Sequence, residues 1–95
     1  MNVIITAIIK AKPSFKEEVH STLLNMVKQT RKEEACILYD LHQDLSDANT
    51  FIFYEIWQDQ EGLDKHNQQP YIKEFGSLIE SHLQEQPQIY LTQKI

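Results

Sequence analysis

The sequence predicts a single α+β domain over residues 1–95, in which an antiparallel sheet carries helices on one face. Two observations lead to this fold class. Segments whose apolar residues alternate with period two, as in strands, are interspersed with segments whose apolar residues recur with helical spacing. In addition, 95 residues of which 41% are hydrophobic suffice for one modest core rather than two domains.

The N-terminal part of the pattern is a strand followed by a helix. Val3–Lys10 is rich in Ile, and both of its faces look buried: Ile5, Ala7 and Ile9 on one, Ile4, Thr6 and Ile8 on the other. Pro13 and Ser14 break the strand and start a helix. Its apolar residues follow helical spacing: Phe15, Val19, Leu23, Met26, Val27 and Thr30.

A hairpin is expected next. Its two strands are Cys36–Gln43 and Thr50–Trp57, because the intervening residues Ser46–Asn49 favour a turn. Alternation along the second strand places four side chains on one face: Phe51, Phe53, Glu55 and Trp57.

Two helices and a strand complete the chain. Gln60–Asn67 is expected to form a short helix, and Pro70 suits the start of a longer one that Pro87 ends. The longer helix has an apolar stripe: Ile72, Phe75, Leu78, Ile79 and Leu83. A last strand covers Ile89–Leu91. This order of elements is that of the ferredoxin-like βαββαβ unit. Its second sheet face would be left bare, so we expect a homodimer built sheet to sheet.

Composition and charge narrow the functional classes. Fourteen acidic and nine scattered basic residues give a net charge of -5, which argues against a nucleic-acid partner. The apolar run near the N-terminus is too short to span a bilayer and has no basic leader, so we expect no membrane association and a cytoplasmic location. The single cysteine, Cys36, excludes a disulfide framework and is expected to be a buried thiol.

Motifs for cofactors and metals are missing. The only glycines, Gly62 and Gly76, fit neither a dinucleotide fingerprint nor a phosphate loop. The histidines are far apart and form no metal-binding spacing: His20, His42, His66 and His82. We therefore expect neither a nucleotide cofactor nor a metal.

The strongest candidate for chemistry is His66, which follows the aromatic strand and returns toward its face. An imidazole titrates near pH 6.5 and can act as a general base, although the residue could instead close a helix turn at the surface. Glu55 is costly among apolar neighbours unless paired. It could orient His66 or a substrate hydroxyl, or pair with Arg31 or a lysine.

Several aromatic residues are candidates for substrate binding. Trp57, Phe53, Phe51 and Tyr39 could sandwich a planar ring, or could simply be core or dimer interface. Tyr71 could supply a hydroxyl to the pocket.

The segment from Arg31 to His66 resembles the antibiotic biosynthesis monooxygenase domain, the family that includes quinol monooxygenases. The resemblance rests on Arg31 before an acidic pair, on Tyr39, on the strand NTFIFYEIW and on the turn LDKH that ends at His66. It implies a dimeric α+β barrel with one pocket per protomer and, in many members, oxygenation without flavin, haem or metal. Two departures occur at turn positions where the family usually has Gly: Ser14 and Ala35.

The related haem-degrading enzymes differ from this chain at their characteristic positions. They use an Asn on the first strand, a Trp on the helix after the third strand and a haem-ligating His. The corresponding residues here are Thr6, His66 and Gly76, so we expect no haem.

These observations lead to one hypothesis with two alternatives. The leading hypothesis is a cofactor-independent monooxygenase in which His66 deprotonates a small electron-rich aromatic, such as a hydroquinone or polyphenol, for reaction with dioxygen. The alternatives are an isomerase or tautomerase acting on a small carbonyl compound, and a non-catalytic dimer that binds a hydrophobic ligand.

Overall fold

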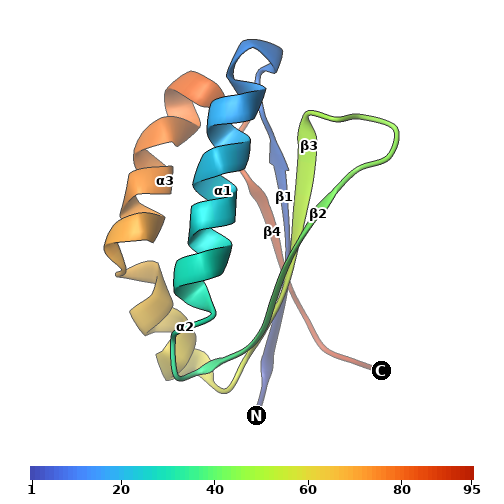
Figure 1. Ribbon diagram of the computed structural model, residues 1–95. Coiled ribbons are helices and arrows are strands. Elements are labelled where there is room, and N and C mark those ends of the chain that lie inside the picture. Colours follow the sequence, from blue (N-terminus) through green and yellow to red (C-terminus); the bar gives the residue numbers. More distant parts are fainter.

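The computed structural model describes residues 1–95 and has two layers, a four-stranded antiparallel sheet and helices that cover one of its faces (Figure 1). The elements are β1 (Val3–Lys10), the 3-10 turn η1 (Pro13–Phe15), α1 (Lys16–Thr30), β2 (Cys36–Gln43), β3 (Thr50–Trp57), α2 (Gln60–Asn67), α3 (Pro70–His82) and β4 (Gln88–Thr92). The strand order is β2-β3-β1-β4. The predicted ferredoxin-like α+β fold is confirmed.

The strand register shows which side chains lie on the face of the sheet that the helices cover and which lie on the uncovered face. β1 pairs with β3 so that Ile5 lies opposite Glu55, and Tyr39 of β2 lies on the other side of Glu55. The face toward the helices carries the buried side chains Ile5, Ala7, Ile9, Tyr39, Phe51, Phe53, Glu55 and Trp57. The face away from the helices, called here the open face, carries Ile4, Thr6, Ile8, Leu38, Ile52, Tyr54, Ile56 and Tyr90. In the single chain the open face is half-buried to exposed, whereas both faces of β1 were expected to be buried.

The longer C-terminal helix is shorter than predicted. It ends at His82, before Leu83 and well before Pro87. Leu83 has an extended backbone and forms a bridge with Ala11, and the Gln84 N–H donates to the Lys10 carbonyl at 2.8 Å. The chain leaves the helix here because the backbone of the β1 end offers these hydrogen bonds.

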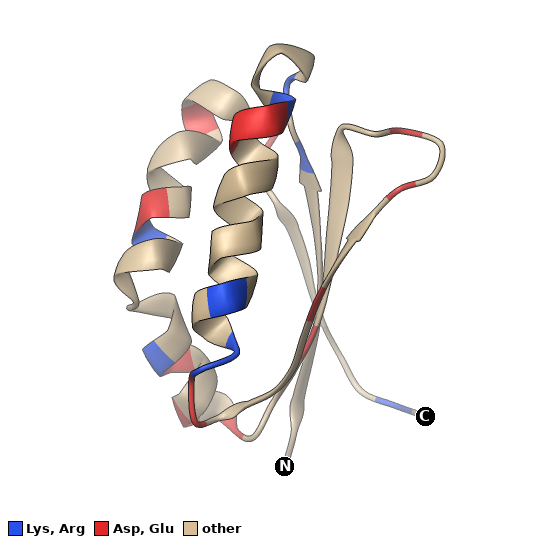
Figure 2. Ribbon diagram, viewed as in Figure 1, with Lys and Arg blue, Asp and Glu red and all other residues tan.

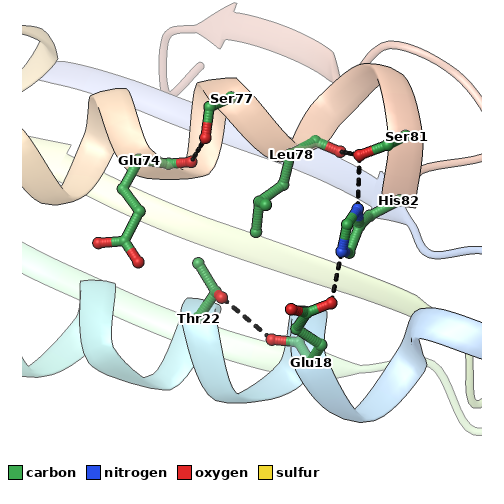
Figure 3. Close-up of polar contacts among 7 residues, drawn as sticks. All are labelled: Glu18, Thr22, Glu74, Ser77, Leu78, Ser81 and His82. Atoms are coloured by element: carbon green, nitrogen blue, oxygen red, sulfur yellow. Dashed lines mark hydrogen bonds and ion pairs between the residues drawn. The ribbon is translucent and has the colours of Figure 1, made fainter.

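A side-chain cluster joins α1 and α3 at the end of the helical layer opposite α2 (Figures 1 and 3). His82 Nε2 contacts the Glu18 carboxylate, and His82 Nδ1 lies 2.6 Å from Ser81 Oγ. The Phe15 ring packs on the His82 ring with centroids 4.0 Å apart. These contacts hold α3 against α1 and so position α3 over the sheet.

Lys and Arg are scattered over the helices, the loops and β1 (Figure 2). No helix has both the length and the apolar character needed to cross a membrane.

The connection between α1 and β2 approaches α2 very closely. A Cβ added at Gly62 would lie 2.3 Å from the Cβ of Ala35. No residue has a positive φ, so Ala35 fits its turn without strain despite departing from the family pattern. The alanine at position 35 is therefore matched by a glycine at position 62.

We predict that Gly62→Ala destabilises the protein by about 1–3 kcal/mol. The backbone must shift to separate the new Cβ from that of Ala35, and this costs more free energy than the better helix propensity of Ala gains. The double variant Ala35→Gly/Gly62→Ala should recover most of this loss. Urea unfolding of the wild type, both single variants and the double variant measures the coupling. A Gly62→Ala variant with the same free energy of unfolding as the wild type would contradict the close approach of Gly62 to Ala35.

Candidate active site

A cavity of about 520 Å³ lies between the covered face of the sheet and the helices α2 and α3. Most of its lining is hydrophobic. The sheet contributes Ile5, Ala7, Tyr39, Phe53 and Glu55, and the helices contribute Leu63, His66, Ile72 and Phe75. Its size and apolar walls suit a small organic ligand.

His66 lies in the wall of this cavity and is only 3% exposed, so the alternative that it closes a surface turn is wrong. Asp59 begins α2 by accepting the Gly62 N–H at 2.8 Å, and His66 follows in the last turn. The imidazole packs on the Trp57 ring with centroids 4.4 Å apart and meets the Tyr39 ring edge-on at 5.5 Å. Packing on two sides fixes the plane of the ring.

The partner of His66 is Glu33, from the connection between α1 and β2. His66 Nδ1 lies 2.8 Å from Glu33 Oε2, and the Tyr71 hydroxyl donates to the same oxygen at 2.5 Å. The Glu33 side chain is 13% exposed. Sequence patterns do not single out Glu33, whose only signal is its place in the acidic pair after Arg31.

Burial lowers the pKa of His66 from its ordinary value, while the hydrogen bond and the negative charge of Glu33 oppose this shift. The imidazole is therefore neutral near pH 7. Because Glu33 accepts, the hydrogen-bond network assigns the single ring proton to Nδ1. Nε2 is left with a free lone pair and no protein partner. This arrangement makes Nε2 a base that can act on a ligand in the cavity.

Glu55 lies in the sheet wall of the cavity and is 6% exposed. Trp57 Nε1–H donates to Glu55 Oε1 at 2.9 Å. Burial raises the pKa of Glu55 to about 7, with Trp57 opposing the shift and the Glu33 charge adding to it. Near neutral pH this side chain can therefore hold a proton or release it.

The partners expected for Glu55 are corrected by the structure. Glu33, not Glu55, hydrogen-bonds His66. Arg31 does not reach Glu55 either, because its guanidinium pairs with Asp40 at 3.1 Å and donates to the Tyr39 carbonyl at 3.2 Å. Of the expected roles, the one that remains is contact with a substrate hydroxyl.

The aromatic wall is smaller than the sequence predicts. Tyr39 and Phe53 line the cavity, with ring centroids 4.8 Å apart. Phe51, Trp57 and Tyr71 do not line it. Phe51 packs under α1, where the His20 ring stacks on it, while Trp57 supports His66 and Tyr71 holds Glu33. Trp57 and Tyr71 thus support the site through His66 and Glu33, whereas Phe51 lies outside it.

No three His, Cys, Asp or Glu side chains converge in a way that could hold a metal ion. Cys36 is half-buried, and burial raises the pKa of its thiol. A raised pKa makes the thiol a poor nucleophile at neutral pH.

Comparison with known proteins finds a matching family and several relatives of this chain. The family model described as "Antibiotic biosynthesis monooxygenase" matches residues 2–77. A Synechocystis protein named "Uncharacterized protein sll1783" is 36% identical over 73 residues, which are 77% of this chain and 50% of that protein. The chain thus spans about half the length of this relative. The Bacillus subtilis protein named "Putative monooxygenase YcnE" is 33% identical over 73 residues, 77% of each chain.

The fold of a solved structure matches almost completely. The crystal structure of PA3566 from Pseudomonas aeruginosa superposes with a TM-score of 0.93 at 30% identity, covering 99% of this chain and 94% of that one. The family match, the two relatives and this superposition agree with one another. The chain belongs to the antibiotic biosynthesis monooxygenase family.

Proposed function

We propose that this protein is a cofactor-independent monooxygenase that oxidises a small electron-rich aromatic, such as a hydroquinone or polyphenol, with dioxygen. One observation carries the proposal: His66 lines a mostly apolar cavity and is hydrogen-bonded at Nδ1 to the carboxylate of Glu33, which leaves Nε2 without a protein partner. Family membership supports the class of reaction.

In the proposed reaction His66 Nε2 removes a phenolic proton, and the resulting anion transfers one electron to dioxygen. Superoxide then joins the phenoxyl radical at a ring carbon that bears hydrogen, and the imidazolium returns its proton to the peroxide. Loss of that ring hydrogen with the terminal hydroxyl releases water and leaves a carbonyl. One oxygen atom enters the product and the other leaves as water, so a hydroquinone becomes a hydroxyquinone and supplies all four electrons.

The protein contributes proton transfer and positioning. A placed general base typically accelerates a reaction by about 10²–10⁴-fold. Glu33 stabilises the imidazolium that forms and fixes the tautomer, as a carboxylate does for a catalytic histidine. The hydrophobic lining limits the access of bulk water to the reactive anion.

A second candidate reaction is an isomerisation or tautomerisation of a small carbonyl compound. The observation that favours it is Glu55, whose pKa of about 7 would allow it to donate a proton while His66 removes another. Such a reaction consumes no oxygen, so oxygen uptake separates the two. For a module that only binds a ligand, the ligand would raise Tm without formation of a product.

We predict that the purified protein, treated with a chelator, consumes oxygen with one or more hydroquinones faster than a blank that corrects for autoxidation. His66→Ala should lower the rate by about 100-fold or more, because the variant lacks the proposed general base. The matched control is His20→Ala, which removes an imidazole on α1 outside the cavity. Equal rates for His66→Ala and the wild type would refute the role of His66.

The open face of the sheet supports the proposal that the protein works as a homodimer. Across β2, β3 and β1 this face presents the rows Leu38–Ile56–Ile4 and His42–Ile52–Ile8, with Asp40–Tyr54–Thr6 between them, and Tyr54 is 38% exposed. Isolated exposed apolar residues are ordinary, whereas a sheet face on which apolar side chains predominate marks an interface. A second copy placed sheet to sheet would cover it in an isologous contact.

We predict that the wild type sediments as a dimer and that Ile52→Lys sediments as a monomer at micromolar concentration, because the buried lysine would have no partner. Leu45→Lys is the control, since Leu45 is fully exposed in the loop before β3. Analytical ultracentrifugation distinguishes the two states. A dimer that survives Ile52→Lys uses another surface.

A further inference from the structure

The charged groups in and next to the cavity are carboxylates, and no Lys or Arg side chain lines it. Of its 19 lining residues none is Lys or Arg, and the titratable ones are Tyr39, Glu55 and His66. The Glu33 carboxylate lies directly behind His66, at 2.8 Å from Nδ1. An anionic substituent in this cavity would meet carboxylates and no cation, in a medium that screens charge poorly.

Two basic side chains on elements beside the cavity are engaged elsewhere. Lys65 of α2 pairs with Glu61 at 3.4 Å, and Arg31 pairs with Asp40 at 3.1 Å. No arginine or lysine lines the cavity, so the lining itself cannot neutralise a carboxylate or phosphate group of a ligand.

His66 and Glu55 are buried polar groups of the cavity wall that can meet a ligand, and the exposed amide side chains of Asn67 and Gln86 also line the cavity. His66 Nε2 can accept a hydrogen bond, and Glu55 Oε2 has no protein partner because Trp57 is bonded to Oε1. The Trp57 ring also packs on His66, so one rigid side chain supports both groups. Burial raises the pKa of Glu55 to about 7, which makes Glu55 a donor below that pH.

We propose that the cavity selects uncharged aromatic diols, with one hydroxyl donating to His66 Nε2 and a second oxygen accepting from Glu55, and rejects the same ring when it carries an anionic group. The choice of an aromatic diol rests on the proposed function. The discrimination by charge rests on the cavity lining alone.

The pH dependence follows from the groups that face Glu55. These are the Trp57 N–H, the Tyr39 phenol, the Cys36 thiol and the carboxylate of Glu33, and His66 lies in the same cavity wall. Burial raises the pKa of Tyr39 and lowers that of His66, so neither changes charge between pH 7 and 8.5. As the pH rises through about 7, Glu55 loses its proton, the donor disappears and a negative charge is added. Affinity for an uncharged diol should therefore fall over this interval.

The test is calorimetric titration without oxygen, which measures binding and prevents turnover. The probes are 1,4-dihydroxynaphthalene-2-carboxamide and the corresponding 2-carboxylate, which have nearly the same shape and differ in charge. We expect the carboxylate to bind the wild type about tenfold or more weakly at pH 8. The carboxamide should bind more weakly at pH 8.5 than at pH 7.

Glu55→Gln keeps an oxygen that can accept from Trp57 and offers a donor without charge. It should narrow the difference between the probes and remove the pH dependence, whereas Glu74→Gln, on the exposed side of α3, should change neither. The comparison of the two probes on the wild type needs no variant. Equal affinity for the two probes, no binding of the carboxamide, or an unchanged pH trend in Glu55→Gln would each overturn the proposal.

Oxygen uptake is measured separately. Selective binding of the uncharged probe without any oxygen consumption leaves the charge selectivity standing and removes the proposed oxygenation. Oxygen consumption only with anionic quinols supports the proposed oxygenation and contradicts the charge selectivity.

Discussion

The hydrogen bond between Glu33 and His66 is the interaction on which the rest of the site depends. It joins the connection after α1 to the last turn of α2, and Tyr71 adds α3 by donating to the same carboxylate oxygen. A carboxylate with so little exposure is costly unless it receives hydrogen bonds. Two donors on one oxygen meet that cost, and in doing so they hold the imidazole in a single orientation and tautomer.

The two carboxylates near the cavity differ because their surroundings differ. Glu33 receives two hydrogen bonds and acts on the ring of His66. Glu55, in the middle of the sheet, receives only the Trp57 N–H, and burial raises its pKa to about 7. One group stabilises positive charge on the base, and the other can carry a proton.

Much of the fold could be predicted from local patterns. Strand alternation placed Ile5 on one face of β1 and, separately, Phe53 and Glu55 on one face of β3. The pairing of β1 with β3 shows that these are the same face of the sheet. The end of α3 could not be predicted from Pro87, because Leu83 leaves the helix to bond with the distant β1 end. The same limit applies to the site, since Glu33 is separated from His66 by 33 positions and no periodic pattern links them.

The aromatic residues show why a shared face does not mean a shared cavity. Phe51, Phe53 and Trp57 all point toward the helices, but the cavity covers only the middle of β3. At one end α1 packs on Phe51, and at the other α2 places His66 on Trp57. Where the helices sit depends on tertiary contacts such as that of His82 with Glu18, shown in Figure 3, which the sequence does not reveal.

The most direct test of this account is the protonation state of His66 by ring nitrogen-15 NMR at pH 7.5, in the wild type and in Glu33→Ala. We expect the wild type to show a neutral ring with the proton on Nδ1 and a bare Nε2, and Glu33→Ala to lose that preference. A wild-type ring that carries its proton on Nε2, or that is an imidazolium at this pH, would contradict the assignment of Nε2 as the base.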